Sequence, residues 1–212
     1  MVMFFMPSGI ENIRMEMIKK GSEEKRMKKR KLIVFLDSGD TLVDEGSEYR
    51  KPGSGVVEHA ELIPGAREAL FRLREEGFLM EMVADGLVES FDHVYRQHGL
   101  EDIFVQRTIS EQVGAEKPSR EMFRTAMEKL GLTDEDRKRV VMIGNNLKRD
   151  IRGANRYGLI SVLTGWSPRY CMTPEGEEEE PDYTVSGPSE LPELLCRLDA
   201  LLEEGKTLKK RR

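Results

Sequence analysis

The sequence predicts an α/β protein built on a doubly wound, three-layer parallel sheet. Short apolar segments typical of buried strands alternate with segments of helical periodicity, and polar residues directly follow several of the strands. This alternation is typical of parallel sheets whose strands are joined by right-handed crossovers. Ligands of such folds bind beyond the carboxyl ends of the strands, so residues at those positions are the candidates for a functional site.

The clearest strand is the continuous apolar run at 32–36, because a strand covered on both faces needs no polar alternation. Further short apolar runs predict strands at 78–84, 103–109, 140–143, 159–163 and 183–185. Apolar residues at helical spacing predict helices within 63–77, 87–99, 123–130, 151–157 and 194–202. The polar segment 43–61 is predicted to be a loop or a small hairpin flap.

Composition and charge indicate one globular core, at 31–204, between a basic extension at 1–30 and a basic tail at 205–212. The extension is expected to be flexible or helical. Hydrophobic residues make up 38% of the chain and charged residues 34%, and no apolar run is long enough for a membrane span. Two widely spaced cysteines indicate reduced thiols in a cytoplasmic protein.

The basic ends, 25–31 and 206–212, stand against a net charge of −5. Clustered Lys and Arg residues can indicate nucleic-acid binding. Solvated termini are the favoured interpretation, because no aromatic residues lie among the basic ones to stack on bases. Neither nucleic acid nor a membrane is therefore expected as a partner.

Groups suited to a metal and a phosphate follow the predicted strands. Asp37 and Asp150, with the Asn145 amide oxygen and a backbone carbonyl, are the oxygen ligands that Mg²⁺ prefers. Lys117 can neutralise phosphate charge, and the N–H groups of Asp85 and Gly86 can bind phosphate oxygens at a helix start. A carboxylate beside Mg²⁺ can attack phosphorus, and phosphoryl transfer then requires mainly positioning and charge neutralisation.

Four segments that contain these residues resemble the motifs of the haloacid dehalogenase-like (HAD) superfamily: VFLDSGDTL, MEMVADG, GAEKPSREMF and VVMIGNNLKRDIRGANRYG. The segment ELIPGAREALFRLREEGF resembles the one that leads into the second motif. The resemblance covers roughly residues 31–204. It implies a Rossmann-like HAD core and a Mg²⁺-dependent phosphatase that cleaves a phosphomonoester through an aspartyl-phosphate.

The resemblance also implies residue roles. Asp37 is the nucleophile, and Lys117 binds both the phosphate and the nucleophile. The Gly39 carbonyl joins Asp37, Asn145 and Asp150 as a metal ligand. Thr41 orients the loop after the first strand. The phosphate site comprises Thr41, Ala84, Asp85, Gly86 and Lys117.

Three positions depart from the family pattern. Gly39 stands where the phosphatases carry an Asp as general acid and base, Ala84 stands in place of Ser or Thr, and Asn145 in place of Asp. We expect Asp40 to act as the acid if its carboxylate faces Asp37. If Asp40 instead caps a turn, the alternative is favoured: a weak or inactive relative that binds a phosphorylated ligand or a protein.

The segments after the first two motifs are too short to hold the cap domain that many family members carry. Capless members of the family often act on larger substrates or use a partner as a lid. The expected substrate is therefore a phosphorylated molecule, small or macromolecular, and a second copy of the chain or another protein is the expected lid.

Overall fold

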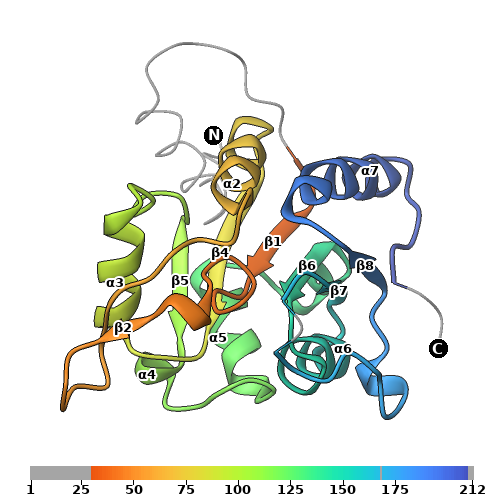
Figure 1. The fold of residues 1–212 in the computed structure, drawn as a ribbon. Coiled ribbons are helices and arrows are strands. Elements are labelled where there is room, and N and C mark those ends of the chain that lie inside the picture. The colour runs from red at the N-terminus through yellow and green to blue at the C-terminus, as the bar shows by residue number, and fades with distance from the viewer. Residues whose placement is uncertain (1–29, 168, 210–212) are drawn as a thin grey trace, which may run out of the picture.

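The computed structural model describes residues 30–167 and 169–209. They form a six-stranded parallel sheet with the order β5-β4-β1-β6-β7-β8 (Figure 1). The strands are β1 (Ile33–Leu36), β4 (Leu79–Ala84), β5 (Gln106–Ile109), β6 (Val140–Gly144), β7 (Ile160–Thr164) and β8 (Tyr183–Val185). The predicted doubly wound parallel sheet is confirmed.

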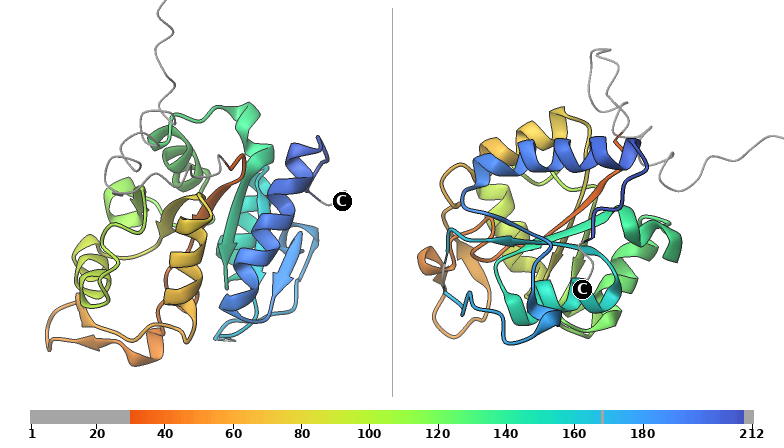
Figure 2. Two further views of the ribbon diagram at one scale, coloured as in Figure 1. Left: turned by 90° about the horizontal axis from the view of Figure 1, so that it is seen from above. Right: turned by 90° about the vertical axis from the view of Figure 1, so that its right-hand side faces the viewer.

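Helices cover both faces of the sheet, which gives the three layers visible in Figure 2. One apolar cluster joins the sheet to α2 (Ala66–Glu75), α3 (Val88–Gln97) and α7 (Leu191–Glu203). The opposite cluster joins it to α5 (Arg120–Lys129) and α6 (Arg152–Tyr157). Side chains of β1 alternate between the two clusters, with Val34 in the first and Phe35 in the second. This two-sided burial explains why β1 is apolar throughout.

The segment after β1 forms the antiparallel hairpin β2 (Tyr49–Arg50) and β3 (Val57–His59), one of the two forms predicted for it. The hairpin is attached to α3 by polar contacts. The Ser90 hydroxyl accepts a hydrogen bond from Val57 N at 2.9 Å, and His98 Nε2 lies 2.7 Å from the Ala60 carbonyl oxygen. The described residues contain no second domain between β1 and α2 or between β4 and β5.

Two short elements at the functional edge were not predicted. The helix α4 (Ser110–Val113) directly follows β5, and a π-helical turn (Leu147–Ile151) precedes α6. The Asn146 side chain begins the π-helical turn by accepting hydrogen bonds from Lys148 N and Arg149 N, at 3.0 and 3.1 Å. Periodicity alone could not indicate this turn, because it depends on a side-chain cap.

Packed residues reach slightly beyond 31–204. The buried Arg30 donates hydrogen bonds to Asp199 and to the Glu76 carbonyl, and Leu208 is also buried. The buried Asp199 carboxylate also accepts from Lys31 N and Leu32 N, which ties the start of β1 to α7. The predicted basic extension lies outside the described residues except at Arg30, and so does the end of the tail.

Neither cysteine forms a disulfide, in agreement with the expected free thiols. Within the described residues, no helix combines the length and the apolar character that crossing a membrane requires.

Candidate phosphate and metal site

Lys117 occupies the centre of a polar cluster at the carboxyl ends of β1, β4 and β6. Its ammonium nitrogen lies 2.6 Å from Asp37 Oδ1, 2.7 Å from Asp150 Oδ1 and 2.9 Å from the Val83 carbonyl oxygen. Burial alone would lower the pKa of Lys117, but Asp150 and Asp37 outweigh it, and the net pKa is raised. A charged ammonium is therefore held between two carboxylates.

Asp37 follows β1 directly and faces the cavity. Its N–H donates to the Ile143 carbonyl at 2.9 Å, which continues the pairing of β1 with β6 by one residue. Thr41 donates its hydroxyl hydrogen bond to Asp37 Oδ2 at 3.0 Å. The Asp37 side chain is 12% exposed, while that of Asp150 is 1% exposed. Of the two carboxylates bound by Lys117, Asp37 is thus the one accessible to a ligand.

Asp150 depends on the glycine at the end of β6. Its Oδ2 accepts a hydrogen bond from Asn146 N at 3.0 Å, which holds the carboxylate against the end of β6. A Cβ at Gly144 would lie 2.3 Å from Asp150 Cγ and Oδ2, closer than any side chain allows. Burial raises the pKa of Asp150, and the Lys117 ammonium opposes that rise.

The four predicted metal ligands line one cavity: Asp37, Gly39, Asn145 and Asp150. Asn145 is buried, and its Nδ2 has no hydrogen-bond partner within the described residues. Among residues 30–167 and 169–209, no group of three or more His, Cys, Asp or Glu side chains is arranged to hold a metal. Two carboxylates, one amide oxygen and one main-chain carbonyl nevertheless fit Mg²⁺, which keeps several waters and needs few protein ligands.

The predicted phosphate-binding residues lie at this edge, but Gly86, Thr41 and Asp85 already have partners. The Gly86 N–H donates to Ser110 Oγ at 2.9 Å, so it is not directed at a ligand. The Thr41 hydroxyl donates to Asp37 and not to a ligand, a bond that suits the loop-orienting role expected of Thr41. Asp85 accepts from Lys117 N at 3.0 Å and from Arg149 Nη1 at 3.2 Å. Ala84 is buried at the end of β4.

Asp40 does not serve the cavity, contrary to the expectation that it replaces the missing acid. Its backbone adopts φ 51°, and its fully buried carboxylate binds the Arg169 guanidinium and accepts from Glu45 N at 3.2 Å. The left-handed backbone turns the side chain away from Asp37 and towards the segment after β7. Asp40 therefore shapes the loop and is not among the residues that line the Asp37 cavity.

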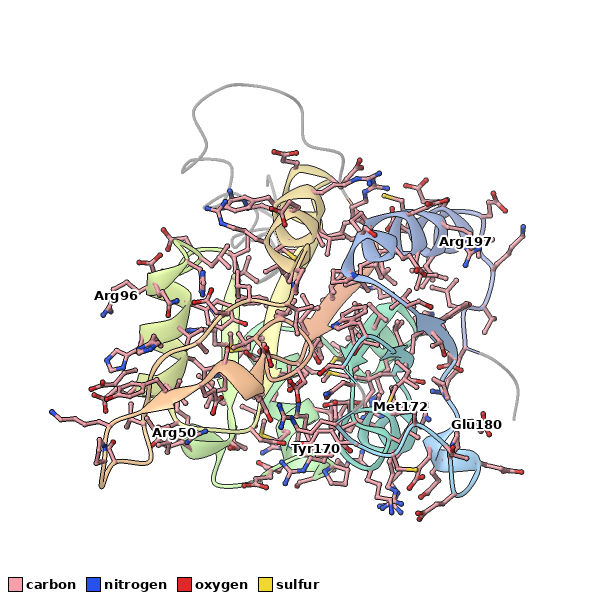
Figure 3. All side chains as sticks on the ribbon, in the orientation of Figure 1. Arg50, Arg96, Tyr170, Met172, Glu180 and Arg197 are labelled. Atoms are coloured by element: carbon pink, nitrogen blue, oxygen red, sulfur yellow. The ribbon has the colours of Figure 1, made fainter. Side chains whose placement is uncertain are left out.

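Four residues outside the predicted metal and phosphate ligands also line this cavity: Glu45, Asn146, Arg149 and Tyr170. In the view of Figure 3, Tyr170 lies between the hairpin, which carries Arg50, and helix α6. The same segment after β7 contributes Trp166, whose Nε1 donates to the Thr41 carbonyl at 3.2 Å. Asn146 and Arg149 lie in the segment VVMIGNNLKRDIRGANRYG after β6. Glu45 and Tyr170 approach Asp37 because the segment before the hairpin and the segment after β7 fold over the end of β1.

Comparison with known families shows which family the chain belongs to. A model of haloacid dehalogenase-like hydrolases matches residues 15–158, and the chain belongs to that family of hydrolases. Curated relatives include a glyceraldehyde 3-phosphate phosphatase of Methanopyrus kandleri, 34% identical over 64% of this chain and 57% of the relative. The pyrimidine 5'-nucleotidase YjjG of Escherichia coli is 40% identical over 47% of this chain and 41% of the relative. The chain spans about half the length of the curated relatives it matches.

Solved structures confirm the fold. A putative HAD-hydrolase YfnB from Bacillus subtilis, described as bound to magnesium, aligns with a TM-score of 0.64 and 18% identity. The alignment covers 79% of this chain and 99% of that one. A HAD phosphatase from Thermococcus onnurineus aligns with a TM-score of 0.61 and 17% identity, over 77% of this chain and 97% of that one.

Proposed function

We propose that this protein is a Mg²⁺-dependent phosphatase that hydrolyses a phosphomonoester through an aspartyl-phosphate on Asp37. The observation that carries the proposal is the position of Lys117, whose ammonium lies 2.6 Å from Asp37 and 2.7 Å from Asp150 at the cavity. A phosphate that enters this cavity meets the Lys117 ammonium directly beside the accessible Asp37 carboxylate. Such a pair suits nucleophilic attack on phosphorus.

The chain's own groups account for the first transfer. Asp37 is oriented by the Thr41 hydroxyl and by its backbone bond to β6, so its oxygen has a defined direction. Lys117 neutralises negative charge on the carboxylates and on the incoming phosphoryl oxygens. Because phosphoryl transfer depends chiefly on alignment and charge neutralisation, this arrangement supplies its main requirements.

Asp37, the Gly39 carbonyl, Asn145 and Asp150 would hold the Mg²⁺ ion. When bound, the ion neutralises charge on the phosphoryl oxygens and fixes their orientation relative to Asp37. Asn145 is buried at the cavity, and its amide oxygen is the atom that would bind the ion, whereas its Nδ2, unpartnered within the described residues, is a donor suited to a phosphate oxygen.

The substrate we propose is a phosphomonoester of a small polar molecule. The relatives named above act on glyceraldehyde 3-phosphate and on a pyrimidine nucleotide, and a phosphoserine phosphatase of Thermus thermophilus is also similar, at 31% identity. A cavity beneath the hairpin, lined by Arg50, Leu87, Phe91 and others, adjoins the Asp37 cavity and can receive the organic part. We propose a cytoplasmic enzyme, whose lid is a second copy of the chain or another protein.

The test is Mg²⁺-dependent hydrolysis of 4-nitrophenyl phosphate by the wild type and by Asp37→Asn. We expect activity that needs Mg²⁺ in the wild type and a loss of at least about 10³-fold in the variant, because the nucleophile is removed. Intact-protein mass spectrometry after acid quench should detect a phosphorylated wild type and an unmodified variant.

One observation favours a second function, that of a weakly active or inactive binder. The carboxylate of Asp40, the acid expected from the sequence, forms an ion pair with Arg169. If neither protein hydrolyses the substrate although both are folded, and if inorganic phosphate still binds the wild type in a calorimetric titration, the binding role replaces the phosphatase. Absence of Mg²⁺ binding in the same titration would contradict the metal site itself.

A further inference from the structure

Glu45 occupies the space that a side chain at position 39 would fill. An ideal Cβ built on Gly39 lies 1.9 Å from Glu45 Oε1 and 2.8 Å from its Cδ. Glu45 begins the short 3-10 turn Glu45–Ser47, which leads from the β1 loop into the hairpin. A carboxylate is therefore present beside Gly39, although it belongs to a residue six positions later in the chain.

The position of Glu45 between two adjoining cavities makes it relevant to the reaction. Glu45 lines the cavity that contains Asp37 and Lys117, and it also lines the cavity beneath the hairpin. Gly39 and Asp85 are shared by both cavities in the same way. A phosphomonoester with its phosphate at Asp37 and its organic part beneath the hairpin has its bridging oxygen at this junction.

The other carboxylates around the cavity already have close partners. Asp37 and Asp150 accept from the Lys117 ammonium, and Asp85 accepts from Lys117 N and Arg149. Within the described residues, the Glu45 side chain makes one such contact, with Arg169 Nε 3.5 Å from Oε2. Its Oε1 faces Gly39, and the side chain is 36% exposed. Besides the nucleophile Asp37, Glu45 is thus the carboxylate at the cavity whose Oε1 is free of a cation contact among the described residues and can meet a substrate.

We propose that Glu45 is the catalytic residue that exchanges a proton with the leaving group, a role that rests on the phosphatase function proposed above. As an Asp37 oxygen forms its bond to phosphorus, the ester P–O bond breaks. The Glu45 carboxylic acid gives its proton to the departing oxygen, which leaves as an alcohol. In the second half, the Glu45 carboxylate takes a proton from water, the water oxygen bonds to phosphorus and the bond to Asp37 breaks. Inorganic phosphate leaves and Glu45 is protonated again.

Leaving-group dependence tests this role. Phenolate is a basic leaving group, so phenyl phosphate needs a proton on its departing oxygen. Dinitrophenolate is a weak base, so 2,4-dinitrophenyl phosphate, also an aryl ester, does not. In Glu45→Gln, kcat/KM for phenyl phosphate should fall by about 10²–10⁴-fold, the usual contribution of general acid catalysis. With the dinitrophenyl ester, kcat/KM should stay within about threefold, because that ratio reports only steps up to the first bond cleavage.

A burst measurement adds a readout that a structural role would not change. Glu45→Gln should release one equivalent of dinitrophenolate quickly and then turn over slowly, because water attack on the phosphoenzyme lacks its base. The matched control is Glu58→Gln, which removes a carboxylate from the same hairpin and does not line either cavity. This control should behave as the wild type does with both esters.

The reciprocal variant supplies the rescue. In the double variant Gly39→Asp/Glu45→Ala, the smaller alanine leaves the space beside position 39 free, and the new Asp side chain places its carboxylate there. The backbone at position 39 is not in the left-handed region, so it accepts a side chain. Hydrolysis of phenyl phosphate should recover at least about tenfold over Glu45→Ala. Equal losses with both esters in Glu45→Gln, or no loss with either, would overturn the role while Asp37-dependent activity remains. No hydrolysis by the wild type would refute the phosphatase function, and the role of Glu45 with it.

Discussion

Glu81 is a buried acid in the middle of the sheet, and its ionisation should govern how stability changes with pH. It lies on β4, is fully buried and accepts a hydrogen bond from the Thr108 hydroxyl at 2.6 Å, while its Oε2 has no partner within the described residues. Burial raises the pKa of Glu81 from 4.5 to about 8, against smaller opposing effects of Thr108 and Lys129. The folded protein therefore carries Glu81 in its neutral form at neutral pH.

The sign and size of the effect follow from proton linkage. Between pH 4.5 and about 8 the unfolded chain loses the Glu81 proton and the folded chain keeps it. The free energy of unfolding therefore falls with rising pH, by about 1.4 kcal/mol per pH unit. Over the whole interval the loss approaches about 5 kcal/mol, which is a large part of the stability of a typical domain. Below pH 4.5 both states hold the proton and the contribution is fully present.

The perturbation is Glu81→Gln, which has the shape of the neutral acid and cannot ionise. Urea unfolding of the wild type and the variant at pH 5, 6, 7, 8 and 9 gives the difference between their free energies of unfolding. This difference should grow with pH in favour of the variant and level off above about pH 8, while other titrating groups cancel between the two proteins. Glu58→Gln, at an exposed residue, serves as control and should show no such growth with pH. A difference that stays constant from pH 5 to 9 would refute the buried neutral acid.

Two further substitutions probe the site and the core. Gly144→Ala places a Cβ 2.3 Å from Asp150 Oδ2 and so displaces that carboxylate. We expect the Mg²⁺ affinity of the folded variant to fall by about 10–100-fold in a calorimetric titration. Unchanged affinity would show that Asp150 is not a metal ligand. Asp199→Ala removes the buried carboxylate that accepts from Arg30 and from two backbone N–H groups, so urea unfolding should show a loss of about 3–5 kcal/mol. A loss below about 1 kcal/mol would show that Asp199 is not needed to hold Arg30, which also bonds to Glu76.

The part of the site on strand ends followed from local pattern. Asp37, Lys117, Asn145 and Asp150 were identified because the carboxyl ends of parallel strands meet at one edge, and the structure brings all four to one cavity. Asp40 was misjudged because its direction depends on a left-handed backbone and on Arg169, which lies far away along the chain. Neither the backbone angle nor that partner can be read from the residues around Asp40.

The sequence by itself determined the parallel sheet, the order of its helices and the carboxylates and lysine at its functional edge. These features depend on periodicity and on residues adjacent to strands, which are local properties of a chain. Only the tertiary structure decided which carboxylate stands beside Gly39. Glu45 reaches that space because the loop after β1 turns back on itself, with Val43 N bonded to the Ser38 carbonyl and Glu45 N bonded to Asp40 Oδ1. The contact joins residues only six positions apart, but an irregular loop has no period that would predict it, and so Glu45 became visible only in the folded molecule.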